Sequence, residues 1–247
     1  MRYDIWNLGS SSEGNCFIVK HKDCKEALML ECGLNYTQIV AGTPLNMAIT
    51  SVLISHEHQD HSLCWRKLHN NAFCVCASVG TADALNDFEG LILRLKEQEW
   101  QPVARYHKSY EVFPLRANHD AAEPFMYLIR APKTEDILLF AIDTAGLNYD
   151  LSQFNITDML IECNFMEELI SEDVNFLHVE RVRRSHMSLD ALCEFFRNQK
   201  SLKNLEQITL CHLSQSNCDP WKAKETIMAA TGVPVRICAA KGGFIDN

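Results

Sequence analysis

The feature that most constrains this chain is a cluster of metal-binding residue types directly after a short apolar run. The run ends at Ile54 and is typical of a buried strand, and the sequence SHEHQDH follows it. Because alternate residues of an extended segment point to the same side, His56 and His58 are expected to point together. Asp60 and His61 follow and can reach a neighbouring position. Imidazole nitrogens and carboxylate oxygens in one group favour zinc, manganese or iron.

The composition is that of a soluble globular protein. The chain has 247 residues, of which 47% are hydrophobic and 22% charged, enough apolar material for a sizeable core. No repeat, low-complexity stretch or linker divides it, so we expect a single domain over residues 1–247. The N-terminus lacks the basic and apolar regions of a signal peptide, and no apolar run is long enough to cross a membrane. These features predict a cytoplasmic protein with no membrane partner.

The eleven cysteines include no C-x-x-C pair, so neither a zinc ribbon nor a thioredoxin-like motif is indicated. We expect most of them to be buried, reduced thiols that pack as small apolar side chains.

Strand-like and helix-like runs recur in two halves of the chain. In the first half, strands are expected at 3–8, 16–19, 27–30, 52–54, 73–77, 112–116 and 125–129, and helices at 63–68 and 81–85. In the second half, strands are expected at 137–142, 159–162, 207–211 and 233–238, and helices at 189–198 and 220–230. Strands mostly precede helices in each half. This order favours an α/β fold in which two sheets are sandwiched between outer helices.

Three further metal-binding side chains stand where predicted strands end. His119 follows the strand at 112–116, Asp143 ends the apolar run that begins at 137, and His212 directly follows the strand at 207–211. Taken singly, each has an ordinary explanation: a loop residue, a helix cap before Thr144, and a hydrogen-bonding residue at a strand end. Their order along the chain is the informative property.

This order resembles the metallo-β-lactamase superfamily, whose hallmark is H-x-H-x-D-H after an apolar strand, then a histidine, an aspartate or cysteine, and a last histidine. The resemblance implies the metallo-β-lactamase fold, an αββα four-layer sandwich, and two divalent metal ions, zinc or manganese. It implies the ligands His56, His58 and His119 for one ion, Asp60, His61 and His212 for the other, and Asp143 as a bridge. A hydroxide between the two ions is then the expected nucleophile, with Asp60 orienting it.

Three segments resemble the YycJ-like (WalJ-like) branch, small exonuclease-like enzymes related to the tRNA 3′-end processing enzymes. GSSSEGN from Gly9 is close to the G-S-S-x-G-N loop of that branch, RSHMSL from Arg184 resembles its R-x-x-S-x-x-H-L-S element, and HLSQSN from His212 matches its H-L-S-x-x-N ending. One departure is Glu31 in LECGL, where the branch has aspartate in V-D-A-G-L. The resemblance implies a DNA nuclease, with substrate contacts from Ser11, Asn15, Arg184, Ser214 and Asn217.

His186 is a second catalytic candidate beside Asp60. It stands near Ser188, a suitable N-cap for the helix that begins at Leu189, so a structural role is one explanation. The other explanation places it beside the scissile phosphate, as a proton donor or as a phosphate ligand. The preceding stretch, 178–184, is the most basic of the chain and is expected to contact backbone phosphates.

The net charge of −9 disfavours a broad basic surface for nucleic acid. The main alternative is therefore a phosphodiesterase for cyclic or other small signalling nucleotides, which would use the same metal chemistry. Asp143 stands where the best-known zinc β-lactamases carry cysteine, which argues against antibiotic hydrolysis. A non-catalytic metal-binding module is less consistent with a complete ligand set. The expected partner is a nucleic acid or nucleotide substrate, and a homodimer is expected by analogy with related enzymes.

Overall fold

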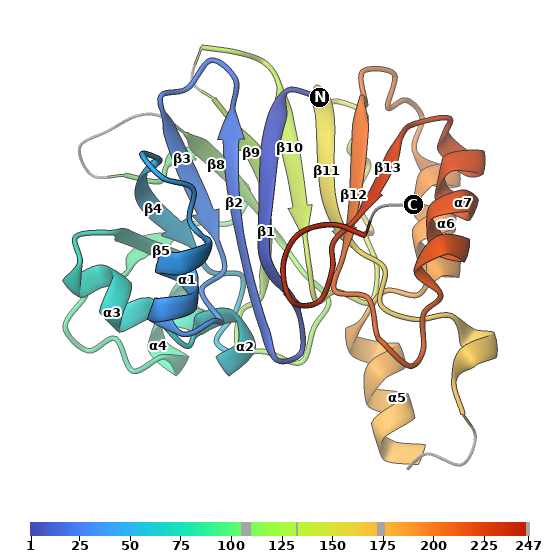
Figure 1. Ribbon diagram of the computed structural model, residues 1–247, viewed down its shortest axis with the longest axis horizontal. Helices are drawn as coiled ribbons and strands as arrows, with labels where there is room; N and C mark the ends of the chain where they lie inside the picture. Colours follow the sequence, from blue (N-terminus) through green and yellow to red (C-terminus); the bar gives the residue numbers. More distant parts are fainter. Residues whose placement is uncertain (105–109, 132, 172–175, 246–247) are drawn as a thin grey trace.

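The structure is a computed structural model that describes residues 1–104, 110–131, 133–171 and 176–245. Two β-sheets lie face to face, and helices cover their outer faces (Figure 1). The architecture is the four-layer α/β sandwich that the order of strands and helices predicts.

The first sheet follows the chain order. Its strands are β1 (Tyr3–Ser11), β2 (Gly14–His21), β3 (Glu26–Leu30), β4 (Ala48–Leu53), β5 (Cys74–Ser78) and β6 (Leu93–Leu95). Strands β1 to β3 are antiparallel, whereas β3 to β6 are parallel. The helices of this half are α1 (Tyr36–Gly42), α2 (Gln59–Ser62), α3 (Trp65–Asn70) and α4 (Val79–Ala84).

The second sheet is built from the rest of the chain. Its spatial order is β13 (Val235–Ile237), β12 (Gln207–Cys211), β11 (Ile156–Glu162), β10 (Ile137–Ala141), β9 (Phe125–Arg130), β8 (Glu111–Arg116) and β7 (Gln101–Pro102). Strands β10 to β13 are parallel, and β7 to β10 are antiparallel. The helical segments are a short 3-10 turn η1 (Glu167–Leu169), α5 (Phe176–Ser185), α6 (Leu189–Asn198) and α7 (Pro220–Thr231). Among the described residues, no helix combines the length and the apolar character that a membrane span requires.

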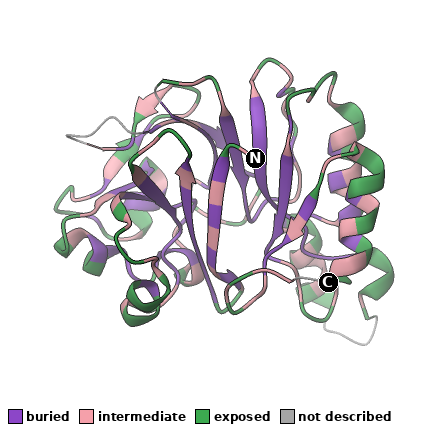
Figure 2. Cartoon of the chain, turned by 45° about the horizontal axis from the view of Figure 1, so that its top comes forward, coloured by how far each residue is buried: buried purple, intermediate pink, exposed green. Residues whose placement is uncertain are grey.

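The central strands are buried on both faces, as Figure 2 shows for the interior of the molecule. Every residue of β10, β11 and β12 is buried, because one face meets the opposite sheet and the other meets helices. Phe17 of the first sheet contacts Phe140 of the second, with ring centroids 6.0 Å apart, in the core between the sheets. A rigid scaffold of this kind holds the strand ends, and the loops that leave them, in fixed positions.

Most of the predicted elements are present, and α6 and β12 have the predicted bounds. The sequence did not predict α1, α2, α5, β6 or β7. The reason differs between them. Helix α1 buries a single side chain, Ile39, and α5 buries only Ser185, so neither has a continuous buried apolar stripe. Helix α2 and the two strands have four residues or fewer, too short for a periodicity.

Of the eleven cysteines, all are free of disulfides and eight are buried, in agreement with the prediction for most of them. Burial raises the pKa of the Cys32 and Cys211 thiols well above the ordinary range, so these side chains stay protonated and pack as apolar groups.

Candidate metal centre

The candidate site lies where parallel strands of both sheets end. Strands β3 and β4 of the first sheet and β10, β11 and β12 of the second all finish at this edge. Open sheets present their binding residues at the carboxyl ends of parallel strands, because the loops that leave those ends converge there. The histidine-rich segment directly follows β4, as the sequence predicts.

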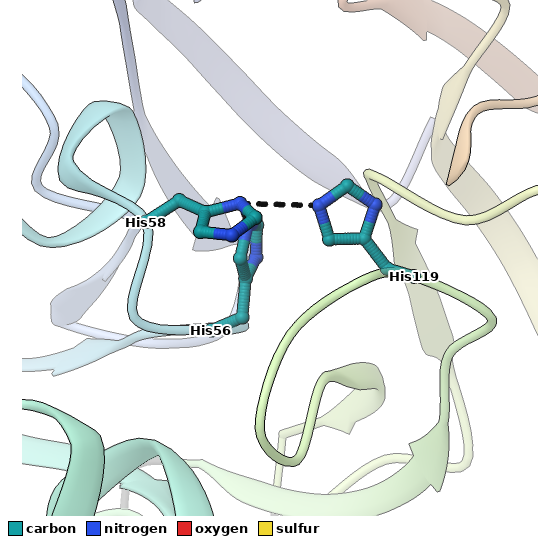
Figure 3. A group of neighbouring side chains, drawn as sticks. All are labelled: His56, His58 and His119. Atoms are coloured by element: carbon teal, nitrogen blue, oxygen red, sulfur yellow. Dashed lines mark hydrogen bonds between the residues drawn. The ribbon is translucent and has the colours of Figure 1, made fainter. Parts of the chain in front are cut away.

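His56, His58 and His119 form a first group, in which the rings converge (Figure 3). The Nε2 atom of His56 lies 2.9 Å from Nδ1 of His58, and Nε2 of His119 lies 3.2 Å from the same atom. His119 Nδ1 lies 2.8 Å from the carbonyl oxygen of Ser185. A carbonyl only accepts hydrogen bonds, so Nδ1 carries the hydrogen, and Nε2 points its lone pair at the group. Converging lone pairs of this kind suit a metal ion.

Asp60, His61, Asp143 and His212 form a second group beside the first. His61 Nε2 lies 3.2 Å from both Asp60 Oδ2 and Asp143 Oδ2, and His212 Nδ1 lies 3.1 Å from Asp143 Oδ1. The Nε2 atom of His212 is buried and has no hydrogen-bond partner among the described residues. A buried imidazole nitrogen without a partner is costly unless a ligand, such as a metal ion, occupies that position.

Asp143 lies between the two groups. Its Oδ2 atom is 3.7 Å from Nε2 of His56 and 3.6 Å from Nε2 of His119, in addition to its contact with His61. Burial alone would raise the pKa of Asp143, but the nearby imidazoles of His212 and His61 hold it well below the ordinary range. The carboxylate is therefore ionised, the form that binds cations.

Two histidines of the first group, His56 and His119, are shifted toward the neutral form that binds metal ions. Burial lowers the pKa of His56 well below its usual value, and the charge of His61 nearby lowers it further. Burial also lowers the pKa of His119. For His61, burial opposes protonation, but Asp143 and Asp60 raise its pKa well above the ordinary range. The imidazole and carboxylate donors of both groups, and their burial, fit a metal ion, so each group could hold one.

Three residues of this edge have an unusual backbone conformation. Glu31, Asp143 and His212 have φ values of 61°, 47° and 51°, in the left-handed region that side chains with a Cβ rarely adopt. Each lies just after a strand: β3, β10 and β12, respectively. The main-chain N–H of His212 donates to Ser10 Oγ at 2.8 Å, which holds this turn. Such strained residues cluster at functional sites.

Glu31, the departure from the V-D-A-G-L pattern, has a defined partner. Its buried carboxylate accepts a hydrogen bond from the N–H of Ser55 at 3.2 Å, and Oε2 lies 3.6 Å from Nδ1 of His61. The Nε2 atom of His61 faces the second group, so Glu31 contacts the opposite side of the ring. A carboxylate behind a ligating imidazole fixes its orientation. The longer side chain of glutamate makes this contact here.

Glu162, at the end of β11, is a site residue that the sequence analysis missed. Its Oε1 atom lies 2.6 Å from His186 Nδ1 and 3.1 Å from His212 Nδ1, and Oε2 accepts a hydrogen bond from the N–H of Thr144. Burial disfavours a charged His186, but Glu162 raises its pKa to about 9. The available signal was a carboxylate ending a strand that is otherwise mostly apolar.

A cavity of about 560 Å³ opens over the two groups. Side chains of α5 line one wall, and the β1–β2 turn and residues 213–217 line the wall formed by loops. Of the predicted substrate contacts, Ser11, Ser214 and Asn217 line this cavity. Asn15 lies below it, fully buried, with Nδ2 3.2 Å from His61 Nε2, so it contacts the metal-binding side chains instead.

Arg184 has a different position from the other predicted substrate contacts. It lines a smaller hollow beside the main cavity, and its Nε donates to the carbonyl oxygen of Glu180 at 3.1 Å. Another arginine of the same helix, Arg181, lines both hollows. The basic stretch that the sequence singles out therefore lies at the site, but through Arg181 and His178.

No family model matches the chain, and no curated protein matches it. Solved structures do. YhfI from Bacillus subtilis, described as a metallo-β-lactamase fold protein, superposes with a TM-score of 0.71 at 12% identity over 99% of both chains. Zinc-bound PqqB from Methylobacterium extorquens gives 0.65 at 16% identity, covering 99% of this chain and 100% of the other. The short form of human tRNase Z gives 0.65 at 13% identity over 98% of both.

This chain has the metallo-β-lactamase fold. The prediction from the order of the histidines and aspartates is thus confirmed at the level of the fold. The two sheets bring together the residues that follow β4, β10 and β12, although His56 and His212 are far apart in the sequence.

Proposed function

We propose that this protein is a phosphodiesterase that uses two divalent metal ions, zinc or manganese, and that it acts as a nuclease. The observation that carries the proposal is the pair of adjoining donor groups, with Asp143 between them, at the floor of a polar cavity. Human tRNase Z, which shares the fold, is by its name a ribonuclease, and this supports phosphodiester chemistry.

The ligand assignment follows from the atoms that face one another. His56 Nε2, His58 Nδ1 and His119 Nε2 would hold one ion. Asp60, His61 and His212 would hold the other, and Asp143 would contact both. When bound, two such ions supply Lewis acidity to phosphate oxygens and lower the pKa of water between them.

His186 and Glu162 supply the acid–base function of the protein itself. His186 lines the cavity, and Glu162 holds its Nδ1, so that Nε2 is the atom left to face a substrate. With a pKa of about 9, His186 is protonated at neutral pH. It can donate a proton to the leaving oxygen or a hydrogen bond to the phosphate. Asp60, which also lines the cavity, would orient the attacking water.

The main alternative is a phosphodiesterase for cyclic or other small nucleotides. Two observations favour it: the net charge of −9, and a cavity bounded by α5 and by the loop at 213–217. A non-catalytic metal-binding module is a weaker alternative, because Glu162 and His186 would then have no role at the cavity.

The test is a hydrolysis assay with purified protein in manganese or zinc. Single-stranded DNA, duplex DNA, RNA and a panel of cyclic nucleotides are offered in parallel, and Asp143→Ala serves as the blank. Turnover of a polynucleotide supports the nuclease. Turnover confined to cyclic nucleotides would replace it with the alternative, and activity that persists in Asp143→Ala would overturn the metal mechanism for either substrate.

A further inference from the structure

One face of helix α5 forms a wall of the cavity. His178, Arg181, Val182 and Ser185 line it, at the spacing of three and four residues that places side chains on one helix face. His186, directly after the helix, continues the row to the metal centre. Figure 1 shows α5 extending beyond the lower edge of the sheets. The row therefore begins at the proposed reaction site and runs outward from it.

The basic residues of this helix differ in their surroundings. Arg183 is bound by two carboxylates, with Glu167 at 2.8 Å and Glu180 at 3.1 Å. Arg184 is directed to the smaller hollow. In the part of the chain that the structure describes, Arg181 is the arginine that lines the main cavity, and His178 lies one turn further out. Of the three arginines of α5, Arg181 is thus the one that faces the main cavity.

Arg181 is oriented before any substrate binds. Its Nε donates to Oδ2 of Asp120 at 2.8 Å. Because both side chains are half exposed, this pair adds little to stability, but it restricts the orientation of the guanidinium plane. A guanidinium carries four further N–H donors on its terminal nitrogens, and their geometry matches two oxygens of one phosphate.

The loops that line the rest of the cavity add mainly uncharged polar side chains to this row. The β1–β2 turn and residues 213–217 contribute hydroxyl and amide side chains from Ser11, Ser214 and Asn217, among others, and one carboxylate, the exposed Glu13. Hydroxyl and amide groups hydrogen-bond sugars, bases and phosphates alike. The cavity therefore has an arginine on its α5 side and mainly neutral polar side chains on the loops that line it.

We infer that Arg181 and His178 bind phosphates adjacent to the scissile one, so that the substrate is a polynucleotide strand lying along α5. This inference rests on the proposed function. At about 1.5 Å per residue, Arg181 and His178 lie roughly 7 and 12 Å along the helix from His186. A strand carries one phosphate per nucleotide, and adjacent phosphates are farther apart than the roughly 3.4 Å that a nucleotide advances along a duplex axis, so this row is long enough to reach phosphates next to the scissile one. A cyclic mononucleotide has one phosphate and would leave the row without a ligand.

A short row of this kind also explains how an acidic chain can bind a polyanion. The net charge of −9 describes the whole surface, whereas a strand of nucleic acid meets only the side chains of the cavity. Arg181 and His178, which line the same cavity as the candidate metal ligands, would provide attraction where the strand lies.

The experiment compares a labelled single-stranded oligonucleotide with bis(p-nitrophenyl) phosphate, which has no neighbouring phosphate. Both are hydrolysed by the metal-loaded wild type, Arg181→Gln, and Arg183→Gln as the control on the same helix. We expect Arg181→Gln to lower the ratio of kcat/KM for the oligonucleotide over the small substrate about tenfold, and to reduce the salt dependence by about one counterion. Arg183→Gln should keep the wild-type ratio. His178→Asn should lower the ratio by a smaller factor.

An unchanged ratio in Arg181→Gln would overturn the inference, whether both activities are retained or both fall together. If the wild type hydrolyses neither substrate, the proposed function fails instead. Fluorescence anisotropy of the oligonucleotide would then still decide the α5 site: weaker binding by Arg181→Gln than by Arg183→Gln supports it, and equal binding overturns it.

Discussion

Histidines are buried next to carboxylates at both ends of the first sheet, but their hydrogen bonding differs. At the end opposite the candidate metal centre, His21 is the last residue of β2. Its Nε2 lies 3.2 Å from Asp136 Oδ2, and its Nδ1 accepts a hydrogen bond from the N–H of Asp23. Both ring nitrogens have a conventional partner. At the other end, nitrogens of His56, His58 and His119 face one another. Burial of a histidine therefore does not by itself indicate a metal ligand. Ring nitrogens that face one another, as in His56, His58 and His119, do indicate one.

The largest expected effect comes from removing the carboxylate that both donor groups share. Asp143→Ala should bind fewer metal ions per chain than the wild type and should lose about a thousandfold or more in turnover, because charge stabilisation of several kcal/mol is lost. Metal content by mass spectrometry and the hydrolysis assay measure the two effects. Wild-type metal content in this variant would show that Asp143 is not a ligand.

A smaller effect is expected from Glu162→Gln, which keeps the size of the side chain but removes its charge. We expect kcat to fall about ten- to a hundredfold. Because Glu162 raises the pKa of His186 to about 9, the protonated form persists up to that pH and is lost as the pH rises through it. Without the charge, the pKa falls, and the alkaline loss of activity should begin at lower pH.

The pH–rate profile of Glu162→Gln, recorded at matched metal content, separates this role from a structural one. A reduced kcat with an unshifted alkaline limb would contradict the assignment of His186 as the group that must be protonated.

The smallest effect on catalysis is expected at the opposite end. His21→Ala should keep the metal content and the turnover per folded molecule, while the free energy of unfolding falls by about 1–3 kcal/mol because Asp136 and the N–H of Asp23 lose a partner. Denaturant unfolding of the metal-loaded protein, beside a metal assay, tests this. Loss of metal from His21→Ala would remove the contrast between the two ends.

The sequence predicted the part of the site that is local. His56, His58, Asp60 and His61 stand within six residues, so a single turn after β4 brings them together, whatever the rest of the chain does. His119, Asp143 and His212 were predicted from their order and from the ends of predicted strands, and the sheets place them beside that turn. The resemblance of this order to the metallo-β-lactamase superfamily implied the fold, and the two runs of strands agreed with it.

Other residues of the site depended on the tertiary structure. Glu31 and Glu162 read as residues at the ends of strands, and only the packing of the two sheets shows which imidazoles they contact. In the basic stretch, sequence alone favoured Arg184, whereas the direction of α5 turns Arg181 into the main cavity.

Periodicity encodes which residues of one element share a face. It contains no information on the distance between side chains that are 24 or 50 positions apart, such as Glu162 with His186 and with His212. Those distances are set by sheet register and by the left-handed turns at Glu31, Asp143 and His212. The sequence by itself determined the residue types of the candidate ligands and most of the strands along the chain. The tertiary structure decided which carboxylates and which arginine lie beside them, because those contacts exist only after the two sheets have packed.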